Sequence, residues 1–413
     1  MRIAYFVDRF PLISETFVLG QICGMIDRGH DVVIYANRVV ESKVRHPVID
    51  RYGLLEKTVF LPEVPRVTRD RLLCVMQALN TAAASGRLRA ALRCLNVFRF
   101  RRDALNGSLL IRFAPLITEE PFQVLHCQFG QLGVAVQSIR DCGIMDGALV
   151  TSFRGTDAMK IATRNPARFA RLFEKGDRFL AVSHAIRKRL EELGCPGEKI
   201  AILRSGVDLN CFEYRGYSEP HDPIRLLTVA RLAPIKGIEF ALHAVKRLSG
   251  SGVNVEYRVL GDGPAAAKLT ELTKTLGIEQ QVVFEGRVDS RRVREALQEA
   301  DILLAPSITG PGGEQEGLPN SLKEAMATGV PSITTNTGGI PELIQDGQTG
   351  YIVDEKDEKA LEEQVTRLVR DWHSTRAVIE GARRKIESEY DLVALNRDIE
   401  VIYTEAARDS GSS

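Results

Sequence analysis

Residues Glu314 to Leu343 read EQEGLPNSLKEAMATGVPSITTNTGGIPEL, and this stretch contains the most informative pattern of the chain. It runs from a glycine-bearing loop into a helical pattern that starts at Pro319, and then into the short β-rich run VPSITTN. Proline is favoured at a helix start, where its missing N–H group needs no partner. A helix between short apolar strands is typical of α/β proteins with parallel sheets.

The same alternation of strand-like runs and helical patterns extends through the whole chain. A first group of strands is RIAYFV, DVVIYA, QVLHCQF, ALVTSF, RFLAVS and IAILRSG, and a second group is IRLLTVA, VEYRVLG, VVFEGRV, DILLAPS and VPSITTN. Nearly continuous apolar strands indicate sheets that are covered by helices on both faces. We therefore predict an α/β protein made of two Rossmann-like domains with parallel sheets.

The length of 413 residues agrees with two domains of roughly 200 residues each. The polar, proline-containing segment Asn210–Pro223 marks the expected boundary. We predict a first domain over residues 1–212 and a second over residues 213–385. Residues 386–413 are expected to form a C-terminal helix that packs back on the first domain.

The composition of the chain argues against several classes of protein. Charged residues make up 26% of the chain and the formal net charge is +1, so nothing in the overall charge favours a nucleic-acid partner. The seven cysteines are scattered and never occur as C-x-x-C, which argues against a disulfide framework and a zinc site. No apolar run approaches the roughly 18 residues of a membrane span. We expect a cytoplasmic protein.

Residues 66–112 are locally basic, with ten Arg against two Asp. Their apolar and basic positions recur at helical spacing, which predicts one or two amphipathic helices. Such helices can lie on an anionic membrane that presents a lipid-linked acceptor. The alternative is a helix pair packed on the first domain with a solvated basic face. We favour peripheral contact with the inner face of the cytoplasmic membrane.

The strand ends of the second domain carry an anion-binding pattern. Ligands of open parallel sheets bind beyond the carboxyl ends of the strands. Arg231 and Lys236 follow one strand, and the helix that begins at Pro319 follows another. The backbone N–H groups of Asn320 and Ser321 would add partial positive charge. This combination predicts a diphosphate site.

Two glutamates flank that helix start. Glu324 lies one turn into the helix, where it can accept hydrogen bonds from a pair of sugar hydroxyls. Glu316 precedes the helix and would point to the group on the far phosphate. In the alternative without a ligand, both carboxylates have the structural role of capping the helix. Arg231 and Lys236 then lie on a solvated loop. The nearby GDGP segment is more easily explained as a turn.

Several segments together resemble retaining glycosyltransferases of family 4, which have the GT-B fold. These are EGLPNSLKEAMATGVP, VARLAPIKG, LGDGP, TGGIPELI and AVSHAIRKRLEELGCPGEKIAILRSGVD. The segments FPLISETFVLGQI, LHCQFG and TSFRGTD are similar to the exopolysaccharide branch, which includes colanic acid and amylovoran biosynthesis enzymes. The resemblance covers nearly the whole chain.

The resemblance implies a role for each matching residue. Glu316 would contact the transferred sugar, and His126 would meet that sugar from the first domain, unless His126 is merely structural. FEGRV (Phe284–Val288) would lie along the nucleobase. The donor-binding residues implied in this way are Arg231, Lys236, Glu324, Asn320, Ser321, Leu318, Gly317, Arg287 and Val288.

The chain departs from the family pattern in two places. Arg154 stands where the family often has His, and the loop from Pro11 to Thr16 contains no glycine. Ser14, Glu15, Arg154 and Asp157 are therefore only loosely placed candidates for the first-domain side of the site.

The implied reaction transfers a hexose from UDP or GDP to a saccharide acceptor, with retention of configuration. No Asp-x-Asp pair occurs in the chain, so we expect no metal and no cofactor. A non-catalytic nucleotide-sugar-binding subunit is the main alternative, and a sugar phosphorylase or epimerase is another. A Rossmann oxidoreductase would need G-x-G-x-x-G after an early strand, and that motif is missing.

Overall fold

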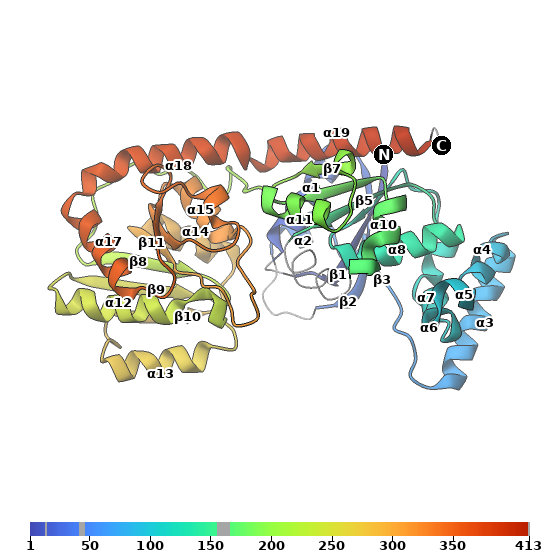
Figure 1. The fold of residues 1–413 in the computed structure, drawn as a ribbon, viewed down its shortest axis with the longest axis horizontal. Coiled ribbons are helices and arrows are strands. Elements are labelled where there is room, and N and C mark those ends of the chain that lie inside the picture. The colour runs from blue at the N-terminus through green and yellow to red at the C-terminus, as the bar shows by residue number, and fades with distance from the viewer. Residues whose placement is uncertain (13–14, 41–45, 155–165, 412–413) are drawn as a thin grey trace. The chain divides into compact units, whose positions relative to one another are not determined.

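The computed structural model describes residues 1–12, 15–40, 46–154 and 166–411. The chain divides into two compact units, of which unit 1 comprises Met1–Leu203 and the stretch from Asn396 onward, and unit 2 comprises Arg204–Leu395 (Figure 1). The division falls earlier than the boundary expected after residue 212. The reason is that Val207 already pairs within unit 2, where its N–H group donates to the Tyr390 carbonyl at 2.8 Å.

Unit 1 is built on a parallel sheet in the order β3-β2-β1-β4-β5-β6-β7. Its strands are β1 (Arg2–Phe10), β2 (Asp31–Val39), β3 (Thr58–Phe60), β4 (Val124–Cys127), β5 (Ala148–Phe153), β6 (Arg178–Ala181) and β7 (Ile200–Ile202). The order reverses between β1 and β4, which lie side by side in parallel register. Such a switch point is where open α/β sheets leave a crevice for ligands.

Several helices of unit 1 form an insertion between β3 and β4. In the described residues the helices of this unit are α1 (Thr16–Asp27), α2 (Val48–Arg51), α3 (Thr68–Ala84), α4 (Leu88–Arg93), α5 (Val97–Phe100), α6 (Arg102–Leu105), α7 (Ser108–Arg112), α8 (Gly130–Cys142), α10 (Ala170–Lys175) and α11 (His184–Glu192), with 3-10 turns at Ala114–Thr118, Pro166–Phe169 and Gly197–Lys199. The basic segment thus forms five short or medium helices, α3 to α7, where one or two were expected. Among the described residues, no helix combines the length and apolar character that crossing a bilayer requires.

Unit 2 repeats the architecture with the sheet order β10-β9-β8-β11-β12-β13. Its strands are β8 (Ile224–Val229), β9 (Val255–Leu260), β10 (Val282–Gly286), β11 (Ile302–Ala305), β12 (Ser332–Thr335) and β13 (Tyr351–Val353). Its helices are α12 (Ile238–Gly250), α13 (Ala266–Leu276), α14 (Ser290–Glu299), α15 (Asn320–Thr328), α16 (Ile340–Leu343), α17 (Glu358–Arg370) and α18 (Thr375–Glu389), with 3-10 turns at Pro234–Lys236 and Trp372–Ser374. The switch point lies between β8 and β11.

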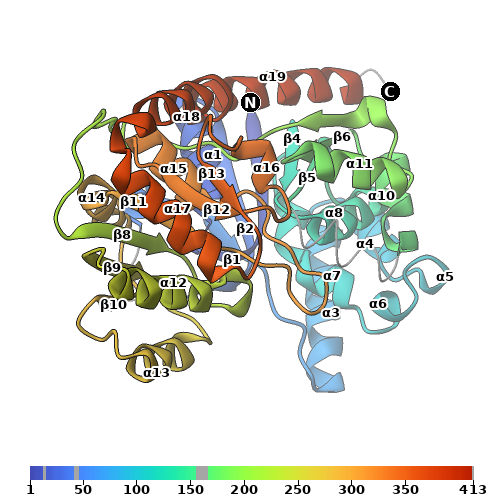
Figure 2. The ribbon, with the colours of Figure 1, turned by 60° about the vertical axis from the view of Figure 1, so that its left-hand side comes forward.

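Strand alternation divides the core of unit 2 between the two faces of its sheet. Leu226 and Leu304 pack in one apolar cluster with side chains of α12 and α17. These two helices lie next to each other in Figure 2. Leu227 and Leu303, one position along each strand, pack in another cluster with α14, α15 and α18. Successive side chains of a strand point to opposite faces, so both faces must be apolar and both are covered. The continuous apolar strands seen in the sequence have this cause.

Two strands were not predicted from the sequence, and both are edge strands. β3 and β13 have three residues each and form the outer members of their sheets. An edge strand has one neighbour instead of two, so it needs neither length nor a continuous apolar run. The other strands were all located from the sequence.

The C-terminal helix α19 (Leu392–Gly411) follows α18, from which Tyr390 and Asp391 separate it. From Asn396 onward it belongs to unit 1. Asn396 Nδ2 donates to the Gly20 carbonyl, and Glu400 accepts from Arg28 Nε at 2.5 Å. Helix α19 therefore completes one side of unit 1 although it lies at the far end of the sequence.

Candidate active site

The switch point of unit 2 brings Lys236 and Glu316 together. Lys236 closes the loop after β8, and Glu316 lies in the loop after β11, the neighbouring strand. Lys236 Nζ and Glu316 Oε2 form an ion pair at 2.5 Å, and their side chains are 20% and 16% exposed. Sequence reasoning assigned these two residues to one site, and the sheet topology places them there.

A glycine of the loop after β12 holds the backbone beside Glu316. Gly338 has φ +57°, and a Cβ at this position would lie 1.8 Å from the Glu316 carbonyl oxygen. The N–H group of Gly339 donates to that carbonyl at 3.1 Å. Only glycine permits both the conformation and the approach. The TGG motif therefore positions the loop that carries Glu316.

Helix α15 begins at the same edge of the sheet. Its N-cap is Pro319, its first helical residue is Asn320, and its first turn contains no acidic side chain. The N–H groups at a helix start have no acceptor within the helix and attract anions. Asn320 and Ser321 are partly exposed, whereas Leu322 is buried. Binding of an anion at this helix start stays a prediction.

Lys323 and Glu324, one turn into α15, differ in exposure and in contacts. Glu324 is partly exposed, and burial raises the pKa of its carboxyl to about 7, against a smaller lowering by the Lys323 ammonium. Lys323 is 1% exposed, and its Nζ donates to the Ser205 carbonyl at 2.7 Å. Lys323 therefore anchors the helix to the start of unit 2, and the expected contact of Glu324 with a sugar stays a prediction. Gly317 and Leu318, just before the helix, are partly exposed.

The GDGP segment packs against the loop that carries Arg231, in addition to turning the chain. Gly261 has φ +137°, and a Cβ there would lie 1.8 Å from the Ala230 carbonyl oxygen. The Leu232 N–H group donates to the Asp262 carbonyl at 3.1 Å. This loop therefore packs against residues 230–232 and fixes the backbone of Arg231, whose side chain is exposed. Explaining the segment as a simple turn missed this packing role.

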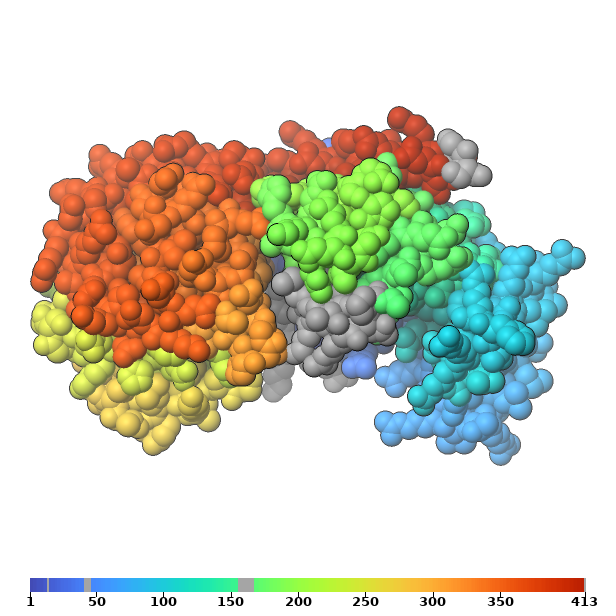
Figure 3. All heavy atoms as spheres, viewed as in Figure 1, coloured from blue at the N-terminus to red at the C-terminus, as the bar shows by residue number. Residues whose placement is uncertain are grey.

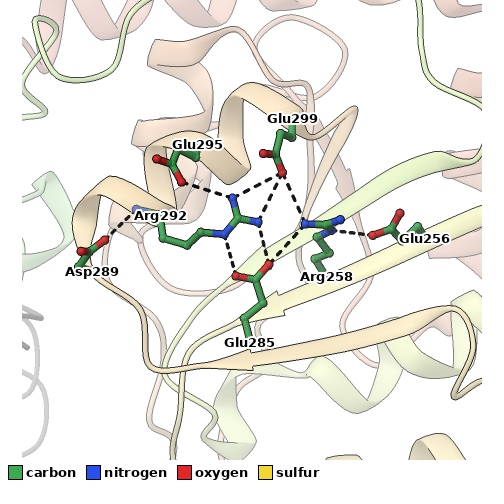
Figure 4. Close-up of polar contacts among 7 residues, drawn as sticks. All are labelled: Glu256, Arg258, Glu285, Asp289, Arg292, Glu295 and Glu299. Carbon is green, nitrogen blue, oxygen red and sulfur yellow. Dashed lines mark hydrogen bonds and ion pairs between the residues drawn. The ribbon is translucent and has the colours of Figure 1, made fainter.

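An ion-pair network supports the segment expected beside a nucleobase (Figure 4). Arg292 donates from Nε and Nη2 to the two oxygens of Glu285, each at 2.8 Å. This bidentate pairing is the main cause that holds the pKa of Glu285 below its usual value. Glu285 directly precedes Gly286, and Arg287 and Val288 follow, exposed and half-buried respectively. The network joins β10 to α14, and sequence reasoning missed it.

Glu355, which lies outside the predicted motifs, holds the start of the loop that leads to Glu316. The Thr309 N–H group donates to Glu355 Oε2 at 2.7 Å, and its hydroxyl donates to Glu355 Oε1 at 2.8 Å. Glu355 follows β13, and Thr309 begins the glycine-rich loop that leads to Glu316. Gln315 Nε2 also donates to the Thr309 hydroxyl at 3.3 Å. No local pattern identifies Glu355, because its partner lies far away in sequence.

In unit 1, His126 lies inside the fold. It is 0% exposed, its Nε2 lies 2.8 Å from Ser152 Oγ, and its Nδ1 lies 2.6 Å from the Tyr403 hydroxyl. Burial lowers its pKa well below the usual value, so the ring is neutral. Both nitrogens are engaged because Ser152 lies on the neighbouring strand β5 and Tyr403 reaches the ring from α19. The structural alternative describes this arrangement, and contact with a donor sugar stays a prediction.

Glu15 and Arg154 lie at the strand ends of unit 1. Burial raises the pKa of Glu15 to about 7, while the positive charge of Arg154 acts in the opposite direction. Arg154 stacks over Phe17 at 4.0 Å and donates to Gln128 Oε1 at 2.8 Å. These contacts give Arg154 a local structural task in the place where the family often has histidine. The candidates Ser14 and Asp157 lie outside the described residues.

Comparison with known proteins now assigns the family. Residues 14–210 match the model for Glycosyltransferase Family 4, and residues 213–385 match the model for Glycosyl transferases group 1. WcaL of Salmonella typhimurium, named for colanic acid biosynthesis, is 35% identical over 97% of this chain and 98% of its own length. The chain belongs to glycosyltransferase family 4. It is a glycosyltransferase, and nothing in the comparisons supports a non-catalytic subunit.

Other relatives agree with this family 4 assignment. The amylovoran biosynthesis glycosyltransferase AmsK of Erwinia amylovora is 32% identical over 95% of this chain and 96% of its own length. Among solved structures, HepE of Anabaena in complex with UDP is similar with a TM-score of 0.70, at 15% identity over 98% of this chain and 100% of that one. The structural likeness, together with the two parallel sheets of this chain, confirms the GT-B fold.

Proposed function

We propose that this family 4 enzyme transfers a hexose from a nucleoside-diphosphate sugar, linked to UDP or GDP, to a saccharide acceptor. The observation that carries the proposal is the Lys236–Glu316 pair beside the start of α15, at the carboxyl ends of β8 and β11. This is where an open α/β sheet binds its ligand. A solved structural relative also holds UDP-glucose.

In this proposal the donor diphosphate binds at the start of α15. Arg231 and Lys236 supply full positive charges, and the N–H groups of Asn320 and Ser321 supply partial charges. Glu324 accepts hydrogen bonds from the ribose hydroxyls, and the base lies along Arg287 and Val288. When the diphosphate binds, the ammonium of Lys236 pairs with it instead of with Glu316. The carboxylate of Glu316 is then available to contact the sugar.

Transfer then proceeds with retention of anomeric configuration. The bond between the anomeric carbon and the phosphate oxygen breaks, and its electron pair leaves with the diphosphate. The acceptor hydroxyl attacks the same face and passes its proton to the departing phosphate oxygen. Glu316 stabilises the positive charge that develops on the sugar, and Arg231 and Lys236 stabilise the leaving group. No metal ion takes part, because these groups already offset the charge.

The acceptor is proposed to be a lipid-linked saccharide at the inner face of the cytoplasmic membrane. The support is the naming of the relatives, which are assigned to colanic acid and amylovoran biosynthesis. Both products are exopolysaccharides, so we place this enzyme in the synthesis of a bacterial exopolysaccharide or related surface glycan.

Calorimetric titration with UDP and GDP, with and without magnesium, tests the donor site. We expect one nucleotide to bind with an affinity that magnesium leaves unchanged. Glu316→Gln should keep that affinity and lose sugar transfer, which is followed by release of the nucleoside diphosphate. If neither nucleotide binds, or if the Glu316→Gln protein transfers sugar at the original rate, the proposal is wrong.

A further inference from the structure

The arginine-rich helical segment, residues 66–112, is coloured blue to cyan in Figure 3. It carries most of the exposed large apolar side chains in the described part of the chain. They are Val67, Leu72, Leu73, Met76, Leu88, Leu92, Val97, Phe98 and Leu105. Phe98 is 101% exposed and Leu105 is 71% exposed. Single exposed apolar residues are ordinary, but a concentration of this kind in one segment marks an interaction surface.

Helix α3 shows why packing within unit 1 does not account for these side chains. One stripe of the helix, at spacings of three and four residues, packs in the core of unit 1: Val75, Ala78, Leu79 and Ala82. A second stripe has the same spacing and consists of Arg69, Leu72, Leu73 and Met76. Its apolar members are 61%, 50% and 53% exposed. A helix needs one apolar stripe to pack on its own domain, so the second stripe is available for something else.

The charge around this second stripe is almost entirely positive. Arg99 pairs with Asp141 at 2.6 Å, and Arg71 and Arg87 donate to nearby backbone carbonyls. The other arginines of the segment are exposed, and none forms an ion pair with another described residue: Arg66, Arg69, Arg89, Arg93, Arg101, Arg102 and Arg112. Leu88 and Leu92 of α4 alternate with Arg89 and Arg93, so apolar and positive groups are interleaved on α4 as on α3.

We propose that the arginine-rich helical segment docks on a bilayer of anionic phospholipids. The aliphatic side chains of α3 and α4, with Phe98, would enter the boundary between headgroups and acyl chains, and the arginines would bind lipid phosphates. The inference deepens the proposed function, on which it rests, by naming the surface that meets the membrane of the lipid-linked acceptor.

Two other occupants fit the surface less well. A symmetric dimer would place the same patch against itself and bring unpaired arginines into mutual repulsion. A nucleic acid would favour aromatic side chains for base stacking, whereas the exposed apolar groups here are aliphatic except for Phe98.

Co-sedimentation with vesicles tests the inference on the full chain. We use vesicles of phosphatidylcholine alone and vesicles that also contain phosphatidylglycerol, at low and high salt. The protein should bind the anionic vesicles, bind the neutral ones weakly, and dissociate as salt screens the arginines. A triple variant, Leu72→Ser with Leu73→Ser and Met76→Ser, should bind at least about tenfold more weakly. Arg89→Gln with Arg93→Gln should weaken binding most at low salt.

Matched controls change exposed residues elsewhere. Val283→Ser and Val401→Ser alter valines that are 44% and 55% exposed, and Arg291→Gln alters an arginine whose side chain is 78% exposed. None should change vesicle binding. The melting temperature of the triple variant should equal that of the wild type, because the substituted side chains are on the surface.

The results of these experiments distinguish a failure of the membrane-docking inference from a failure of the proposed donor site. Loss of vesicle binding in the triple variant, with nucleotide binding and sugar transfer in detergent unchanged, supports it. Equal binding of wild type and triple variant to anionic vesicles overturns it. It is also overturned if the wild type is a dimer in solution by light scattering and the triple variant is a monomer. If vesicles bind as expected but neither UDP nor GDP binds, the proposed donor site fails and the docking surface stands.

Discussion

The carboxyl of Glu324 has a pKa raised to about 7 by burial, which makes it the most informative single group of the proposed donor site. Only the ionised carboxylate can accept hydrogen bonds from both ribose hydroxyls without donating one. Because the raised pKa keeps the carboxyl protonated below about pH 7, nucleotide affinity should be highest above that pH. Calorimetry should show affinity falling by up to tenfold per pH unit below the pKa.

Glu324→Gln provides the control for this pH dependence. Glutamine has nearly the same shape and does not titrate, so the affinity of the variant should be weaker at high pH and almost independent of pH. A variant that keeps the original pH profile would show that another group titrates.

Lys236 is the second residue whose replacement tests the site. Lys236→Ala should weaken nucleoside-diphosphate binding by about 1.5–3 kcal/mol, because it removes a charge-assisted hydrogen bond to phosphate. Lys268→Ala serves as its control, since Lys268 pairs with Glu239 and its side chain is 74% exposed. Unchanged affinity in the Lys236→Ala protein would refute the placement of the diphosphate.

At the scale of an element, the loop from Thr309 to Glu316 depends on Glu355. Glu355→Gln leaves one acceptor oxygen where two receive hydrogen bonds from Thr309. The loop should then hold Glu316 less firmly, and we expect the turnover number to fall about tenfold, equivalent to about 1.4 kcal/mol. Nucleotide affinity should change little, because Lys236 and the start of α15 lie outside this loop.

Steady-state kinetics with a measured nucleotide affinity checks this prediction. Glu363→Gln is a suitable control, since the Glu363 side chain is 61% exposed on α17. An equal loss of affinity and turnover in Glu355→Gln would indicate a general disturbance of unit 2 instead of a displaced loop.

At the scale of the whole molecule, unit 1 is closed by the last helix of the chain. Tyr403 on α19 contacts His126 at 2.6 Å and the Tyr5 hydroxyl at 2.8 Å, and all three side chains are fully buried. Tyr403→Phe should destabilise unit 1 by about 1–3 kcal/mol, because it leaves buried polar groups without a partner.

Thermal unfolding followed by circular dichroism measures this loss, and nucleotide binding by unit 2 should persist. Tyr214→Phe, at a tyrosine that is 38% exposed, should leave the melting temperature nearly unchanged. If Tyr403→Phe melts like the wild type, the buried network contributes little to stability.

The two-unit architecture and the meeting of Lys236 with Glu316 were predictable from sequence, because both depend on local patterns. Apolar strands, helix starts and loop motifs recur at short spacing, and parallel topology brings the ends of β8 and β11 to one edge. The pairing of Lys236 with Glu316 and the start of α15 were located in this way, and donor binding by these residues stays a prediction. β3 and β13 were missed because short edge strands leave little signal.

The remaining features depend on contacts between residues far apart in the chain. His126 is enclosed by Tyr403, Thr309 is held by Glu355, and α3 carries one stripe on the core and another on the surface. A periodic pattern states that a side chain is apolar or polar but does not state which distant group it will meet. Burial and pairing are properties of the packed chain, so the local sequence could propose the chemistry of this enzyme while the fold alone assigned its supporting residues.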